Sequence, residues 1–305
     1  MNLADVMSQL VSLFLMMFVG YVVARAGIMT PDFRARLSHF TLSAVAPCAI
    51  LSAVLGSDAT PSMMLSAVGV SFVFYIFQVI FAAALVRIVP SKKEERGWDQ
   101  LMLIFTNVGF MGIPVIQSIY GVDGVARLSM FILMFNLFFF SYGMLLIASG
   151  EKINFKAMLN PCIAAALLGL ICGTTGLHFP AVIEKTMSSI GAMNTPLAMM
   201  IIGSSVAHSD IVSALRNPRL YRVSGLSMIA MPLLTLGVVL FLPIDPILKG
   251  ISVLLAAMPI AGNCSMIANI YAPGDMSTSH ATIVSTLSSA ATLPVICALL
   301  TMILS

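Results

Sequence analysis

The sequence predicts an all-α integral membrane protein of ten transmembrane helices. They form two inverted five-helix repeats, with broken, crossed fourth and ninth helices. The composition, a succession of apolar runs and a pairing of prolines between the two halves of the chain predict this fold. Of the 305 residues, 59% are hydrophobic and 9% are charged, with a mean hydropathy of +1.04. Soluble domains carry about 25% charged residues, so this chain is predicted to lie in a membrane.

Ten apolar runs follow one another with short polar or charged breaks between them. Each is long enough to cross roughly 30 Å of hydrocarbon as a helix. The first is predicted to be a retained helix rather than a signal peptide, because residues 1–10 contain Asp5 and no Lys or Arg. In chain order the predicted spans are 6–24, 37–56, 62–88, 99–120, 125–148, 159–176, 182–206, 219–241, 247–270 and 279–303.

The positions of the Lys and Arg residues predict the orientation, because positively charged short loops stay in the cytoplasm. With both termini outside, only Arg127, Lys185 and Lys249 lie on the outer face. The predicted location is therefore the inner (cytoplasmic) membrane, crossed many times. No basic patch is interleaved with exposed aromatic residues, so no nucleic-acid partner is expected. The predicted cytoplasmic side holds Arg25, Arg34, Arg36, Arg87, Lys92, Lys93, Arg96, Lys152, Lys156, Arg216, Arg219 and Arg222.

Prolines inside the spans pair between the two halves. Pro47 matches Pro196 at an offset of 149 residues, and Pro114 matches Pro259 at an offset of 145. These offsets predict repeats over residues 1–150 and 151–305 within a single membrane domain. Because five spans per half is an odd number, the second repeat must enter the membrane from the opposite side. The alternative is a chance alignment of prolines, which are common in membrane helices.

Glycine and proline interrupt two of the spans at corresponding places. Gly109, Gly112 and Pro114 are predicted to break the fourth span, and Pro259 and Gly262 the ninth. For either span alone, a simple kink is the usual interpretation. Two interruptions at matching positions instead indicate backbone that lines a cavity, since freed backbone groups at mid-depth need protein or water as partners.

The predicted directions of the two spans place the start of each second half-helix near the bilayer midplane. Two positive helix ends would then face one centre and favour an anion such as a carboxylate. Pro114 suits the first turn of one half-helix, and Asn263 or Ser265 could cap the other. Asn136 lies in mid-span, where a substrate contact and an interhelical hydrogen bond are both open. The candidate substrate-binding residues are Asn107, Gly109, Gly112, Pro114, Asn136, Pro259, Gly262, Asn263 and Ser265.

Other chemistries find little support in the sequence. All twelve Asp and Glu residues fall in predicted loops or near helix ends, which disfavours an ion site built on a buried carboxylate. The five cysteines form no CxxC pair, so neither a metal site nor a cofactor is expected. No H-E-x-x-H motif or Ser/Cys triad is evident, and the chain is not expected to be an enzyme.

Several motifs resemble the auxin efflux carrier family, which includes the plant PIN-FORMED exporters and bacterial organic-acid carriers. They are Asn107-Val-Gly-Phe-Met-Gly-Ile-Pro114, the pair Asn160-Pro161, and the segments MPIAGNCSMIANIY and STLSSAATLPVI. The resemblance implies ten helices in inverted repeats, a substrate at the crossing of two broken helices, and elevator-like movement of one bundle. Plant relatives have a proline where this chain has Cys264, so the second break could lie several residues away.

The predicted function is that of a secondary transporter for a small organic anion, a mono- or dicarboxylate of the auxin or malate and malonate type. Two alternatives stay open: a sodium-coupled symporter resembling the bile acid carriers, and a membrane solute sensor without transport. The expected partners are the organic anion and the lipid bilayer, and the resemblance also implies a possible homodimer.

Overall fold

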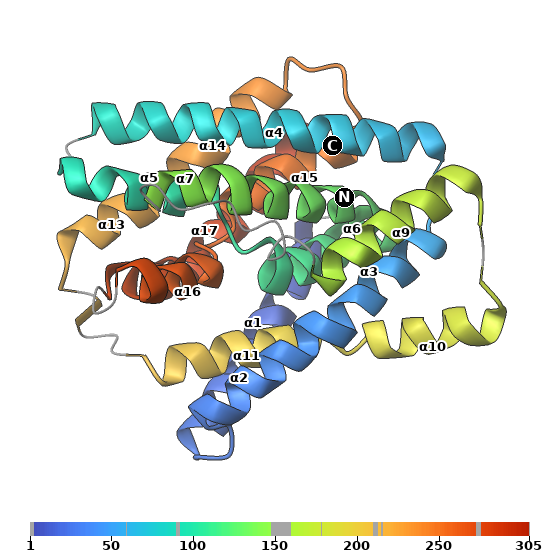
Figure 1. The fold of residues 1–305 in the computed structure, drawn as a ribbon, viewed down its shortest axis with the longest axis horizontal. Helices are drawn as coiled ribbons and strands as arrows, with labels where there is room; N and C mark the ends of the chain where they lie inside the picture. The colour runs from blue at the N-terminus through green and yellow to red at the C-terminus, as the bar shows by residue number, and fades with distance from the viewer. Residues whose placement is uncertain are drawn as a thin grey trace. The chain divides into compact units, whose positions relative to one another are not determined.

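The computed structural model describes residues 3–58, 60–89, 92–147, 160–177, 179–209, 213–214, 216–272 and 276–304. Within these ranges the chain is helical, and its only β-type pairing is an isolated bridge between Thr106 and Ile260. Figure 1 shows the helices, coloured along the chain from blue at the N-terminus to red at the C-terminus. The predicted boundary between the repeats, at residues 150 and 151, lies outside the described residues.

Several helices begin with the same sequence device, a polar cap followed by proline. The side chains of Thr30, Asn160, Asn217 and Asp245 each accept a hydrogen bond from the backbone N–H two or three residues further on, at 2.7–3.3 Å. The next residue is proline in all four cases. Proline suits this position because its missing N–H would have no partner inside the helix.

Seven helical segments in the described part of the chain are long and apolar enough to cross a membrane. The sixth and ninth predicted spans correspond to shorter apolar helices, Pro161–Thr175 and Pro246–Ala257. The fourth and fifth share one segment that turns at Gly121, with φ 63°. The count of ten and the inverted repeat therefore stay predictions. The seven are Val6–Arg25, Pro31–Leu55, Pro61–Ile88, Val108–Ile147, Ala181–Ala207, Pro218–Val239 and Ser277–Ile303.

By its internal contacts the chain divides into two compact units, each with segments from both halves of the sequence. Unit 1 comprises the described residues of Met1–Ser71, Gly109–Asn136 and Phe155–His208. In it α11 packs against α1 and lies beside α2 (Figure 1). Gly20 and Gly203 allow close approach of α1 and α11, since a Cβ at either would collide with the facing backbone. Its helices are α1 (Leu3–Arg25), α2 (Pro31–Phe40), η1 (Thr41–Val45), α3 (Ala46–Leu55), α9 (Pro161–Thr175), α10 (Ala181–Gly191) and α11 (Asn194–Ala207).

Unit 2 comprises the described residues of Phe72–Val108, Leu137–Asn154 and Ser209–Ser305. In it α15 packs on α14 and α17, and α5 contacts α7 and α13. Two helices, α4 (Pro61–Ile88) and α6 (Ile113–Phe138), have residues in both units. The other elements of unit 2 are η2 (Lys93–Glu95), α5 (Arg96–Ile104), η4 (Phe139–Gly143), α7 (Met144–Ile147), α13 (Pro218–Gly225), η5 (Leu226–Ala230), α14 (Met231–Val239), α15 (Pro246–Ala257), α16 (Gly262–Tyr271) and α17 (Ser277–Leu304).

Candidate functional site

The first interruption of helical structure follows α5, which ends at Ile104. Phe105 is extended, with φ −103° and ψ 96°, and Thr106 and Asn107 also lie outside the helix. The π-helix η3 (Val108–Gly112) then resumes helical structure and leads into α6. Three consecutive residues in an apolar region therefore have backbone groups that need partners other than those of a helix.

The second interruption follows α15, which ends at Ala257. Met258 is extended, with ψ 152°, and α16 begins at Gly262. Pro259 accounts for this break, because proline restricts the residue before it to extended conformations and has no N–H for a helical hydrogen bond. The interruption thus covers residues 258–261, at the proline that the sequence indicated.

The two interrupted segments lie antiparallel and pair with each other inside unit 2. Thr106 and Ile260 form an antiparallel bridge. The N–H of Asn107 donates to the carbonyl oxygen of Pro259 at 2.7 Å, and the N–H of Ala261 donates to that of Phe105 at 3.0 Å. Each break therefore supplies the hydrogen-bond partners that the other lacks. We call this arrangement, residues 105–107 with 258–262, the crossing.

Buried hydroxyl groups complete the hydrogen bonds of the crossing. In an uninterrupted helix the carbonyl of Leu255 would accept from the N–H of residue 259, which is a proline here. That carbonyl instead accepts from the hydroxyl of Thr106 at 2.6 Å and from the N–H of Met258 at 3.2 Å. The hydroxyl oxygen of Ser285 in α17 accepts from the N–H of Ile260 at 3.1 Å. These two side chains fix the crossing in a region where Thr106, Ile260 and Ser285 are all buried.

One side of the crossing is open. Gly262, the first residue of α16, is exposed, and a Cβ built on it would meet no atom within 4 Å. The cap residue of α16 is Ala261, which provides no side-chain hydrogen bond to the helix. Asn107 and Asn263 are partly exposed in the same unit. The positive end of α16 therefore faces open space with two amide side chains on the segments that flank it.

Two details of the predicted site differ from the structure. Neither Asn263 nor Ser265 caps α16, because the helix begins after Ala261 and both residues lie inside it. The hydroxyl of Ser265 instead lies 3.1 Å from that of Thr282 in α17. The sequence prediction placed the helix start too late, since Gly262 is an unusual first helical residue and Asn263 a common cap.

The glycines and the proline of the fourth span lie beyond the break rather than at it. Gly109 and Gly112 belong to η3, and Pro114 is the second residue of α6. The prediction that these three residues open the helix is therefore wrong in position, since the extended residues 105–107 precede them. All three belong to unit 1, whereas Asn107 belongs to unit 2.

Asn136 takes part in an interhelical hydrogen bond. Its side-chain oxygen accepts from the amide nitrogen of Asn160 at 2.8 Å, and its own amide donates to the carbonyl of Ile132 at 2.8 Å. The side chain of Asn160 also caps α9. Of the two roles left open for Asn136, the structure shows the interhelical one, in unit 1. Of the candidates, the crossing contains Asn107, Pro259 and Gly262, while Asn263 and Ser265 follow inside α16 of the same unit.

Sequence reasoning did not include Thr106 or Ser285 among the candidate site residues. A general signal was present, because Pro259 cannot supply the helical N–H donor to the carbonyl of Leu255, one turn earlier. The described residues contain no group of three or more His, Cys, Asp or Glu side chains placed to hold a metal ion. The chemistry of the crossing thus comes from backbone N–H groups, amides and hydroxyls.

Comparison with known proteins gives two findings. A family model described as membrane transport protein matches residues 5–297. An uncharacterized transporter of Methanothermobacter thermautotrophicus is 25% identical over 262 residues, which cover 82% of this chain and 83% of that protein. The family match runs through both interrupted segments of the crossing and through both units.

Proposed function

The chain belongs to the membrane transport protein family, which is auxin efflux carrier-like, and on that premise we propose that it is a secondary transporter for a small organic anion. The substrate class is a mono- or dicarboxylate. The proposed site is the open side of the crossing, with Asn107, Gly262 and Asn263 as the nearest groups. The proposed location is the cytoplasmic membrane, with both termini outside.

The uncapped start of α16 is the observation that carries this proposal. Helix N-termini bind anions because their first N–H groups have no partner within the helix and their dipole is positive there. No Asp or Glu occurs in residues 100–122 or 246–272, the two stretches that form and flank the crossing. A carboxylate would therefore meet N–H and amide donors without a neighbouring negative charge from these stretches.

The same arrangement supports a moving site. Every hydrogen bond described above for the crossing joins residues of unit 2, so this unit can carry the site as one body. We therefore propose alternating access of the elevator type, with unit 2 as the transport bundle, in a fold of ten helices built as two inverted repeats. Two broken helices that meet near the midplane are the usual form of such sites.

The proposal is tested with purified protein in proteoliposomes and radiolabelled mono- and dicarboxylates. Asn107→Ala is expected to lower uptake about two- to thirty-fold, the range for one dipole or amide contact of roughly 0.3–2 kcal/mol. Gln117→Ala, which removes an exposed amide in unit 1, is the matched control and should leave uptake unchanged. Equal uptake by Asn107→Ala and the parent protein would remove Asn107 from the site.

The same assay separates the alternatives. Uptake that requires a sodium gradient would favour a sodium-coupled symporter, for which neutral oxygens such as that of Thr106 are possible ligands. Substrate binding without counterflow would instead identify a solute sensor. Proton coupling is tested by imposing a pH gradient in sodium-free buffer.

A further inference from the structure

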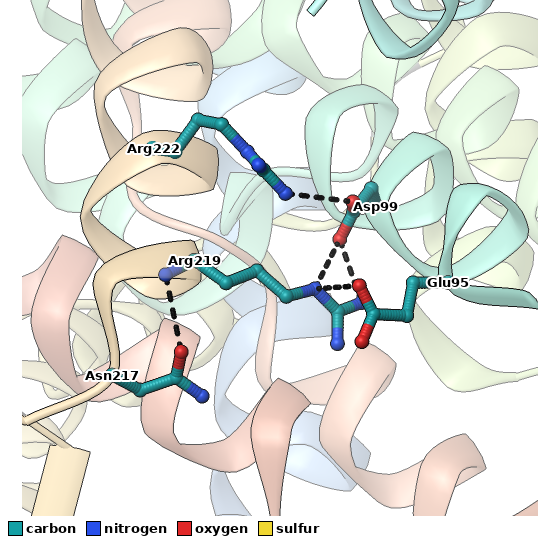
Figure 2. A network of polar contacts seen from close by, with 5 residues as sticks. All are labelled: Glu95, Asp99, Asn217, Arg219 and Arg222. Carbon is teal, nitrogen blue, oxygen red and sulfur yellow. Dashed lines mark hydrogen bonds and ion pairs between the residues drawn. The ribbon is translucent and has the colours of Figure 1, made fainter. Parts of the chain in front are cut away.

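A network of charged side chains joins α5 to α13 inside unit 2, and Figure 2 shows it. Asp99 is 2% exposed. Its Oδ1 accepts from Nη2 of Arg219 at 2.7 Å and from Nε at 3.0 Å. Glu95 lies 3.4 Å from Nε of Arg219, and Asn217 caps the helix that carries this arginine. Arg219 is thereby held in a fixed position by two carboxylates.

A cavity of about 860 Å³ opens beside this network. Four basic side chains and one acidic side chain line it, and buried Asp99 lies behind them, so basic groups exceed acidic ones by two. We call it the basic cavity. Its lining residues are Lys92, Glu95, Arg96, Asn217, Pro218, Arg219, Arg222 and Ser277.

The basic side chains of the cavity differ in how far their charge is balanced. Arg219 has close carboxylate partners, whereas Arg222 reaches Asp99 only at 3.9 Å. Lys92 and Arg96 are exposed, and neither forms an ion pair within the described part of the chain. Three cations therefore face the cavity with charge that an incoming anion can meet.

The cavity lies at the ends of membrane-crossing segments. Pro218 and Ser277 are the first residues of two such segments, and Lys92 follows the end of a third at Ile88. Along α5, Ile104 beside the crossing is eight residues from Arg96, and along α17 Ser285 is eight residues from Ser277. Each path is about 12 Å of helix, close to half of a roughly 30 Å hydrocarbon layer.

The segment ends and the path lengths each indicate how deep the basic cavity lies in the membrane, and the two agree. The path lengths depend on the proposed position of the crossing at the midplane, whereas the segment ends do not. Both place the basic cavity at the level of lipid headgroups, and the distribution of Lys and Arg places that level on the cytoplasmic side. Basic pockets between helices on this side are suited to anionic headgroups.

We propose that the basic cavity is a binding site for the phosphate of an anionic phospholipid headgroup, separate from the transport site. Lys92, Arg96 and Arg222 bind the phosphate, and Arg219 forms the fixed wall behind it. The volume is that of a pocket for a whole headgroup rather than for a single small ion. An anionic lipid in the cavity would contact both α5 and α13.

The chain offers a local probe, because Trp98 in α5 is its single tryptophan. We would reconstitute the protein in phosphatidylcholine and measure how brominated phosphatidylglycerol quenches Trp98 fluorescence. Brominated phosphatidylglycerol is expected to quench at much lower mole fractions than brominated phosphatidylcholine. In Lys92→Gln/Arg96→Gln the preference should fall by up to about thirty-fold, since each basic residue near a lipid surface contributes about fivefold.

The matched control is Lys93→Gln/Arg216→Gln. It removes two exposed cations from the same predicted cytoplasmic loops, and neither residue lines the cavity. This variant should keep the preference of the parent protein. Equal quenching by both brominated lipids, or an unchanged preference in Lys92→Gln/Arg96→Gln, would overturn the proposal.

A soluble anion is the competing occupant, and inorganic phosphate is its probe. A rise in the melting temperature with millimolar phosphate, lost in Lys92→Gln/Arg96→Gln, together with no preference for phosphatidylglycerol, would assign the cavity to a soluble anion. Neither readout depends on transport, so failure here and failure of the proposed transport function are distinguishable.

Discussion

The crossing and the basic cavity lie at opposite ends of α5 and use different chemistry. At the crossing, the polar groups are backbone N–H and carbonyl groups, hydroxyls and amides. At the cavity they are full charges, with Asp99 and Arg219 at 2.7 Å. One helix of nine residues, about 13 Å long, joins the two regions.

This difference follows from the cost of desolvation. Moving a full charge into hydrocarbon costs several kcal/mol unless it is paired, whereas a hydrogen-bonded hydroxyl costs little. In the proposed transport site, an anion at mid-depth would therefore meet uncapped N–H groups without a fixed positive charge. Near the headgroups, water and lipid phosphates solvate charges, so charged arginine and lysine side chains can bind an anion there.

Removing the fixed wall of the cavity should have the largest effect on stability. Arg219→Ala removes both hydrogen bonds from the guanidinium to buried Asp99, while Arg222 lies 3.9 Å from this carboxylate, and we expect a loss of about 3–5 kcal/mol in unfolding free energy. The measurement is unfolding by SDS titration in mixed micelles. Arg216→Ala, an exposed arginine close by in the sequence, should cost less than about 0.5 kcal/mol.

A double-mutant cycle sharpens this prediction. If the loss in Arg219→Ala comes from the buried charge of Asp99 that Arg219 no longer balances, then Asp99→Asn combined with Arg219→Ala should recover much of it. Additive losses in the double variant would mean that the two side chains stabilise unit 2 independently. In that case the network is not the coupled pair that its geometry indicates.

Removing one hydroxyl at the crossing should lower the unfolding free energy by a smaller amount. Ser285→Ala leaves the buried N–H of Ile260 without its partner, which should cost about 1–3 kcal/mol. Ser289→Ala is the matched control, one turn further along α17. Both hydroxyls donate to a carbonyl three residues back in their own helix, at 3.0 and 2.6 Å, but only Ser285 also accepts from the crossing. Equal losses in the two variants would show that the bond to Ile260 contributes nothing measurable.

The sequence predicted the two interruptions because proline and glycine have strong local effects on a helix. Pro259 marks the second break correctly. At the first break the sequence pointed to Gly109, Gly112 and Pro114, whereas the extended residues come earlier, at 105–107. No local signal ends α5 at Ile104. The pairing of residues 105–107 with residues 259–261, from the other half of the chain, accounts for this helix end. Such long-range hydrogen bonds cannot be predicted from local sequence patterns.

Charged residues illustrate the same limit. Position along the chain placed Asp99 near a helix end, as it is, but gave no sign that it would be buried against Arg219, which is 120 residues away. Asn136 shows the converse, because its burial was predicted while its partner, Asn160, was not. Burial and depth follow from local composition, but partners follow from the tertiary fold.

A substitution at the start of α16 should have the smallest effect on stability but a clear effect on transport. Gly262→Ala adds a methyl group where the structure leaves open space, so unfolding free energy should change by less than about 1 kcal/mol. The same methyl group would stand beside the uncapped N–H groups and hinder an anion there, and we expect a several-fold lower uptake. Gly237→Ala in α14, also with nothing within 4 Å of its Cβ, should leave uptake unchanged. If Gly262→Ala transports like Gly237→Ala, the anion does not approach this helix end, and the open side of the crossing is not the substrate site.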